Sequence, residues 1–265
     1  MSEPNKGPGR VSREERNGVF LIGLDRAGKR NAFDSAMLQD LAKALGEYEA
    51  NPELRCAVLF AHGDNFTAGL DLMELAPQLA EGTFGYAENT IDPFGVTAPR
   101  RTKPLIIALQ GMCWTAAIEM ALNADIAIAA DDARFSQIEV LRGIAPAGGA
   151  TVRLPKVAGW SDAMKYMLTG MEFSANEARE MRIISEILPK EQLMNRALEL
   201  ANMIVNAAPL GVKATMESAL AARYEGDEAG LALLNEQLFG LLKSKDVQEG
   251  VMAMLEKRIP IFKGQ

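Results

Sequence analysis

Short apolar segments alternate with helical patterns over the first 190 residues, and this alternation constrains the fold more than any other feature of the sequence. Strands buried on both faces of a sheet are almost continuously apolar. Five segments have this character: residues 19–24, 56–62, 105–110, 125–130 and 184–188. Apolar residues recur at helical spacing between them, at 33–48, 70–79 and 116–124. Strands that alternate with helices predict βαβ units, a largely parallel sheet and an α/β fold class.

From residue 190 onward the pattern becomes helical, with few strand signals. Helical spacing covers residues 191–207, 210–224 and 227–258. Gly230, Gly240 and Gly250 interrupt the last of these, which predicts two helices with a break. Ser174 and Glu177 have the spacing of a capping box and predict the start of another helix. We therefore expect an α/β core over residues 1–190, followed by a helical region over 191–265.

Composition excludes several classes of protein. The chain has 265 residues, with 28 Lys and Arg against 35 Asp and Glu, a net charge of −7. This acidic balance argues against nucleic acid as a partner, because phosphate binding needs a basic face. Two cysteines and one histidine exclude a disulfide scaffold, a Cys-rich zinc site and a multi-histidine metal site.

Neither an export signal nor a membrane span is expected. The N-terminus is polar and lacks an apolar core segment. The longest apolar stretch, residues 104–130, is interrupted by Gln110, Glu119, Asn123 and Asp125. Because a bilayer requires about 20 predominantly apolar residues, we expect a soluble, cytoplasmic protein.

The segment from Gly23 to Lys29 matches the phosphate-binding pattern GxxxxGK after a predicted strand. The next position should be Ser or Thr to bind Mg²⁺, and it is Arg30. A helix also does not begin until about residue 33, so backbone amides would be poorly placed for phosphate. We interpret this segment as a charged loop rather than a nucleotide site.

A turn of small residues, 66–71, joins a predicted strand to a predicted helix. Such a turn can present unpaired backbone N–H groups to an anion or a polarised carbonyl. Taken alone, it is also compatible with an ordinary strand-to-helix turn in which Gly69 takes a special backbone conformation.

Two glutamates flank one apolar α/β unit. Glu119 has eight largely apolar residues before it and three after. A carboxylate there is costly unless it is hydrogen-bonded or protonated, and desolvation raises its pKa towards neutrality. Glu139 follows a strand-like stretch and precedes the glycine-rich segment 143–149, in a predicted loop. Locally satisfied or solvated charges would explain either residue singly, but not both, so the pair is a candidate for acid–base catalysis.

Together these segments resemble the enoyl-CoA hydratase/isomerase, or crotonase, family. The resemblance spans residues 18–265 and is most specific over 108–170. It includes the turn Ala68-Gly-Leu-Asp71, the segment from Gln110 to Glu119 and the stretch Phe135-Ser-Gln-Ile-Glu139. It implies a crotonase-like core of ββα repeats and a C-terminal helical region that covers coenzyme A (CoA) and mediates assembly into trimers or dimers of trimers.

The resemblance also implies roles for individual residues. The backbone N–H groups of Leu70 and Ala116 would form an oxyanion hole, and Glu119 and Glu139 would hold a water between them. No metal or redox cofactor is implied, because CoA enters as part of the acyl-CoA or enoyl-CoA substrate. The implied CoA-binding residues are Arg26, Lys29, Ala68, Asp71, Phe262 and Lys263.

One departure from the family pattern concerns the oxyanion hole. Thr115-Ala116-Ala117 stands where the family usually has three glycines, which adds side chains beside the thioester. Hydratases keep both glutamates, so their presence here favours an enoyl-CoA hydratase. The alternatives are a Δ3,Δ2-enoyl-CoA isomerase, which can use one glutamate, and a non-catalytic acyl-CoA-binding paralogue, which the lost glycines suggest.

Overall fold

Six strands form the main sheet, in the order β1-β2-β3-β4-β6-β9, in a computed structural model that describes residues 5–265. The strands from β2 to β9 run parallel, and β1 pairs antiparallel with β2 at one edge. The strands are β1 (Arg10–Arg16), β2 (Val19–Asp25), β3 (Cys56–Ala61), β4 (Leu105–Leu109), β6 (Ile126–Ala130) and β9 (Glu186–Leu188). The predicted parallel α/β sheet is thus confirmed, whereas β1 was not predicted.

A second, smaller sheet orders the segments that precede the two glutamates. It consists of β5 (Met112–Trp114), β7 (Arg134–Ser136) and β8 (Phe173–Ser174), in the order β5-β7-β8. Phe135 and Phe173 stack with their ring centroids 5.4 Å apart, and both are buried. This apolar pairing fixes β7, and therefore the residues that follow it, against the core.

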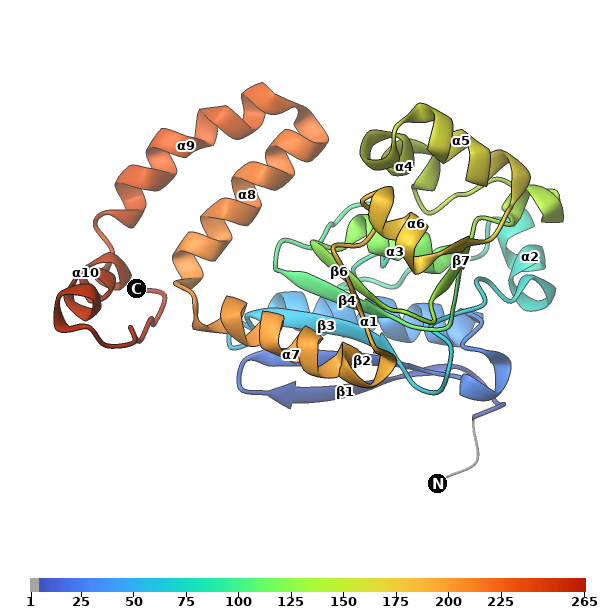
Figure 1. The fold of residues 1–265 in the computed structure, drawn as a ribbon, viewed down its shortest axis with the longest axis horizontal. Helices are drawn as coiled ribbons and strands as arrows, with labels where there is room; N and C mark the ends of the chain where they lie inside the picture. The colour runs from blue at the N-terminus through green and yellow to red at the C-terminus, as the bar shows by residue number, and fades with distance from the viewer. Residues whose placement is uncertain (1–4) are drawn as a thin grey trace.

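Helices cover both faces of the main sheet (Figure 1). Apolar residues of α1, including Leu41 and Leu45, pack in one core cluster, and Leu193, Ala197 and Ala201 of α7 pack in the other. The predicted capping box is confirmed, because Ser174 and Glu177 cap α6 reciprocally. The helices of the body are α1 (Ser35–Ala50), α2 (Leu72–Ala80), α3 (Ala116–Asn123), α4 (Ala150–Ala158), α5 (Trp160–Thr169), α6 (Ala175–Glu180) and α7 (Lys190–Asn206), with the 3-10 helices η1 (Ala27–Lys29) and η2 (Glu139–Arg142).

The C-terminal helices extend away from the α/β body to one side (Figure 1). They are α8 (Pro209–Glu225), α9 (Asp227–Leu241) and α10 (Lys245–Glu256). The predicted break between two helices is confirmed, and it lies between Leu241 and Lys245. It does not fall at a glycine, because Gly230, Gly240 and Gly250 all lie inside helices. Ser244 caps α10 by accepting a hydrogen bond from the Val247 N–H. Among the described residues, none of the helices is long and apolar enough to cross a membrane.

Candidate active site

Two chain segments lie side by side at the carboxyl end of the main sheet. Thr67 and Cys113 form a parallel bridge, and the Trp114 N–H donates to the Thr67 carbonyl at 3.1 Å. Leu70 and Ala116 each lie three residues beyond this bridge. Within residues 5–265, neither backbone N–H has a hydrogen-bond acceptor. The structure therefore brings together the two N–H groups expected to form an oxyanion hole.

The backbone of Leu70 is held by the chain at Phe33. The Phe33 N–H donates to the Gly69 carbonyl, and the Asp71 N–H donates to the Phe33 carbonyl, both at 2.8 Å. In a parallel pairing of this kind the N–H of the intervening residue points away from the partner strand. The apolar spacing predicted a helix that starts at residue 70. Because Leu70 is held in this bridge, α2 begins instead at Leu72.

Ala116 is the first residue of α3, where a backbone N–H has no acceptor inside the helix. Thr115 caps this helix with φ +48° and ψ −98°, a conformation that is strained for a β-branched residue. Ala116 and Ala117 are helical with negative φ. The change from glycine thus leaves both alanines unstrained and places the strain on Thr115 alone.

Glu119 lies one helical turn beyond Ala116 and is only 5% exposed. Its Oε1 atom accepts a hydrogen bond from the Ala150 N–H at 3.3 Å. The carboxyl group is therefore hydrogen-bonded by a residue distant in sequence, and not by the backbone at the start of its own helix. Burial raises the pKa of Glu119 to about 7 despite this hydrogen bond, and the charge of Glu139 acts in the same direction. A carboxyl group of this kind can exchange a proton near neutral pH.

Glu139 is the first residue of η2, and not part of an open loop as predicted. It is 6% exposed, so it is not a solvated surface charge. Burial raises the pKa of Glu139, and its Oε2 atom has no hydrogen-bond partner among the described residues. Both glutamates are therefore buried, and the charge of Glu139 is near enough to raise the pKa of Glu119.

The expected CoA-binding residues near the N-terminus lie together. Arg26 pairs through its guanidinium with Asp71 at 2.9 Å and with Asp34 at 3.2 Å, and the Ala68 N–H donates to the Arg30 carbonyl. These contacts use the Nε and Nη1 atoms of Arg26, so two carboxylates already compensate its charge. The side chain of Lys29, in contrast, is exposed and forms no ion pair within the part of the chain that the structure describes.

The backbone of this loop does not resemble a nucleotide-binding loop. The amides of Gly28 and Arg30 donate to carbonyls of Asn5 and Ala27, and α1 begins only at Ser35. These amides are therefore not free to bind a phosphate.

Phe262 and Lys263 lie elsewhere, at the end of the C-terminal arm (Figure 1). Phe262 packs beside Gly250, and the Lys263 N–H donates to Asp246 at 2.8 Å, both within the region of α10. One chain therefore does not bring these two residues to the loop that carries Lys29.

Gln137 is a candidate site residue that the sequence analysis did not single out. It lies two residues before Glu139 and is fully buried, yet neither its amide oxygen nor its amide nitrogen has a hydrogen-bond partner among the described residues. Buried polar atoms in proteins are nearly always paired, so this amide is a candidate to bind water or substrate. The sequence feature that could have identified Gln137 is its position inside the motif from Phe135 to Glu139.

His62 lies directly after β3, and its Nε2 atom is 2.7 Å from the Ser12 hydroxyl. Among the described residues, it forms no hydrogen bond with Glu119 or Glu139. Within residues 5–265 there is no cluster of three or more His, Cys, Asp or Glu side chains that could hold a metal ion.

Comparison with known proteins connects this geometry to a family. The family model described as enoyl-CoA hydratase/isomerase matches residues 14–265. A 2,3-dehydroadipyl-CoA hydratase of Escherichia coli is 33% identical over 96% of this chain and 98% of its own length. The enoyl-CoA hydratase EchA19 of Mycobacterium tuberculosis is 30% identical over the full length of both chains. The crystal structure of a probable enoyl-CoA hydratase/isomerase from Mycobacterium abscessus superposes with a TM-score of 0.94, at 43% identity, covering 98% of this chain and 100% of that one.

Proposed function

The chain belongs to the enoyl-CoA hydratase/isomerase family and has the crotonase fold, and we propose that it adds water across the 2,3 double bond of an enoyl-CoA thioester. The observation that carries this proposal is the pair of buried glutamates, Glu119 and Glu139, beside the unpartnered N–H groups of Leu70 and Ala116. A hydratase needs both elements, because one orders the water and the other stabilises the charge that its attack creates.

In this mechanism the thioester oxygen accepts hydrogen bonds from Leu70 and Ala116. One glutamate of the pair accepts a proton from a water molecule as the water oxygen bonds to C3. The electrons of the double bond move towards the thioester, whose oxygen acquires enolate character, and the other glutamate donates a proton to C2. Loss of one donor from such a hole typically costs about 3–4 kcal/mol in the transition state. We assign the glutamates as a pair, because coupled carboxyl groups titrate together.

Two observations favour this reaction over the alternatives. A Δ3,Δ2-enoyl-CoA isomerase can transfer its proton with one carboxylate, whereas burial raises the pKa of both glutamates here. A non-catalytic paralogue would be suggested if the Thr-Ala-Ala segment disrupted the oxyanion hole. Instead, the N–H of Ala116 remains without an acceptor at the start of α3. No metal or separate cofactor is needed for the proposed steps.

We propose that coenzyme A is bound by two copies of the chain. Lys29 would contact its phosphates from one copy, beside Arg26, Ala68 and Asp71. Phe262 and Lys263 would reach the same molecule from a neighbouring copy, because they lie on the distant arm of their own chain (Figure 1). This arrangement is consistent with assembly into trimers or dimers of trimers through α8, α9 and α10.

The buried cysteines support a cytoplasmic location. Cys56 and Cys113 are both free thiols, which suits a reducing compartment.

The test measures loss of the enoyl-thioester absorbance with crotonyl-CoA, longer 2-enoyl-CoA substrates, an aryl substrate and 2,3-dehydroadipyl-CoA. We expect hydration of at least one substrate and a loss of turnover by about two orders of magnitude or more in Glu119→Gln. Near-normal activity in that variant would contradict the assignment. A 3-enoyl substrate distinguishes the isomerase, since isomerisation that survives Glu139→Gln would favour that reaction.

A further inference from the structure

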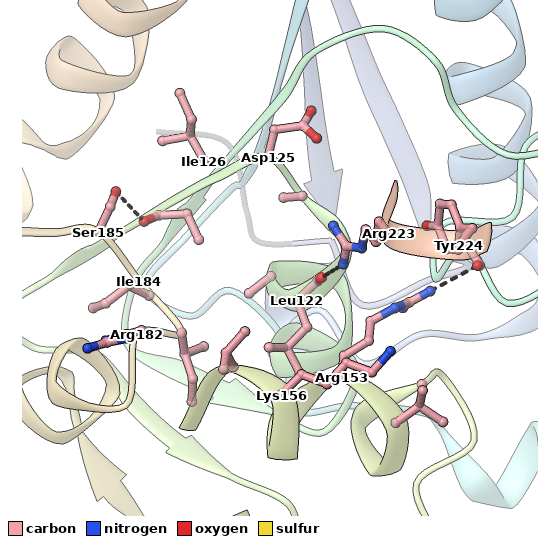
Figure 2. Close-up of a pocket in the computed structure, with 18 of the residues that line it drawn as sticks. Leu122, Asp125, Ile126, Arg153, Lys156, Arg182, Ile184, Ser185, Arg223 and Tyr224 are labelled. Atoms are coloured by element: carbon pink, nitrogen blue, oxygen red, sulfur yellow. Dashed lines mark hydrogen bonds between the residues drawn. The ribbon is translucent and has the colours of Figure 1, made fainter. Parts of the chain in front are cut away.

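A cavity of about 860 Å³ lies between the end of α8 and the α/β body. Its walls come from the end of α3, the start of β6, α4 and residues 183–185, with Arg223 and Tyr224 of α8 on the facing side (Figure 2). The cavity is distinct from the candidate active site. Arg153 lines the cavity and donates to the Gly148 carbonyl at 3.3 Å, so it forms part of the wall between the two.

The lining of this cavity is strongly basic although the chain as a whole has a net charge of −7. Its one carboxylate, Asp125, is already paired with Arg101 at 2.7 Å. Within residues 5–265, no carboxylate forms an ion pair with any basic side chain that lines the cavity. These basic side chains are Arg100, Arg153, Lys156, Arg179, Arg182 and Arg223.

Tyr224 gathers three of the guanidinium groups at one end of the cavity. The guanidinium carbon of Arg100 lies 4.4 Å from the centre of the tyrosine ring, and that of Arg223 lies 5.8 Å from it. Arg153 reaches the Tyr224 hydroxyl from α4, as Figure 2 shows. Arg153 also donates to the carbonyls of Phe94 at 2.6 Å and Gly95 at 2.9 Å. Carbonyl groups orient these guanidinium groups but leave their positive charges uncompensated.

We propose that this cavity binds a small phosphate-bearing anion. Unpaired positive charges held close together repel one another, and a multivalent anion removes this repulsion. Arginine presents donors in a planar fork that matches phosphate oxygens, and an aromatic ring beside it keeps the fork in place. The volume also falls in the range typical of small-molecule sites, about 300–1,000 Å³.

The test is isothermal titration calorimetry with pyrophosphate, at low salt, on the full chain saturated with CoA so that the proposed CoA-phosphate site is filled. We expect one site per chain, with an affinity that falls as salt is added. Lys156→Gln and Arg223→Gln should each weaken binding at least about fivefold, since each removes a charged partner. Lys213→Gln, which removes an exposed lysine of α8 outside the cavity, is the matched control and should bind like the wild type.

Three results would overturn the proposal. The first is the absence of pyrophosphate binding to the wild type. The second is binding that Lys29→Gln abolishes and Lys156→Gln leaves intact, which would place the anion at the CoA site. The third is a change in assembly size in Lys156→Gln with unchanged pyrophosphate binding, which would assign the basic surface to contact with a second copy of the chain.

Discussion

The hydroxyl group of Thr115 lies so close to Gly69 that a β carbon on Gly69 would collide with Thr115 Oγ1. This contact joins the segment that carries Leu70 to the segment that carries Ala116, and so sets the spacing of the two candidate oxyanion donors. Gly69 is required here for a second reason, because its φ of +92° is unfavourable for residues with a side chain.

The first prediction follows from this contact. Gly69→Ala should push the two segments apart and lower kcat by about 10²–10³, the effect of losing one oxyanion donor. The expected measurement is steady-state hydration of the best enoyl-CoA substrate, together with the binding of CoA, which should change little.

Gly159→Ala is the matched control for Gly69→Ala. Gly159 also has a positive φ, +81°, but no atom lies within 4 Å of the position that its β carbon would occupy. This control should lose stability by about 1–3 kcal/mol, because its backbone conformation, with φ +81° and ψ +162°, is unfavourable for a residue with a side chain, and it should keep its activity. Equal activity in the two variants would show that the contact with Thr115 does not position the donors.

The second prediction concerns the stability cost of the buried glutamate. Burial raises the pKa of Glu119 from its ordinary value, near 4.5, to about 7 in the folded state. The folded state therefore holds this proton more tightly than the unfolded state, and ionisation destabilises the fold progressively between these two pH values. Glu119→Gln should become more stable than the wild type as pH rises through this interval, by on the order of 3 kcal/mol at pH 8.

Urea unfolding of both proteins at several pH values between 4.5 and 8 checks this prediction. Glu177→Gln is a control of opposite sign, because hydrogen bonds from Ser174 lower the pKa of Glu177. The wild type should therefore gain stability relative to that variant as pH rises through the ordinary carboxyl range. A pH-independent difference between the wild type and Glu119→Gln would mean that Glu119 is not desolvated.

The sheet could be predicted from the sequence where its strands are buried on both faces. Residues 56–62 and 105–110 form continuous apolar runs because helices cover both faces of the sheet, and both became strands, β3 and β4. β1 has no such run: it is an edge strand in which only Val11 is buried, so its sequence is mostly charged. Helix α4 was not predicted, because it contains Pro155 and is flanked by Gly149 and Gly159, and both residue types have low helix propensity.

The candidate site was only partly predictable for a different reason. The motifs located Leu70, Ala116 and both glutamates, because each lies within a short local pattern. The acceptors and donors that define their chemistry come from distant parts of the chain, such as Ala150 for Glu119. The ion pairs of Arg26 with Asp34 and Asp71 are likewise invisible to sequence spacing, and so is the gathering of guanidinium groups around Tyr224.

The third prediction tests the proposed phosphate contact of Lys29. Lys29→Gln should raise KM for CoA thioesters about three- to tenfold, the effect of one exposed charge-assisted contact, and leave kcat unchanged. The same substrates attached to pantetheine, which lacks the phosphates of CoA, provide the control and should show no change in KM. An equal increase in KM for both kinds of thioester would show that Lys29 acts on something other than phosphate.

The fourth prediction concerns the apolar face of the C-terminal arm. Leu231, Leu234 and Leu238 of α9 are each about half exposed, at 59%, 48% and 53%. Burying a leucine side chain typically stabilises an interface by about 1.5–3 kcal/mol, and a carboxylate in its place adds a desolvation cost. Leu238→Asp should therefore shift the protein from trimers or larger species to monomers in sedimentation velocity. It should also raise KM for CoA thioesters, because Phe262 and Lys263 would no longer reach a neighbouring copy.

Leu168→Asp is the control for this change. Leu168 lies on α5 of the body and is 67% exposed, and its substitution should leave both the assembly and KM unchanged. A monomeric wild type, or a trimer that tolerates Leu238→Asp, would contradict the proposed role of the arm.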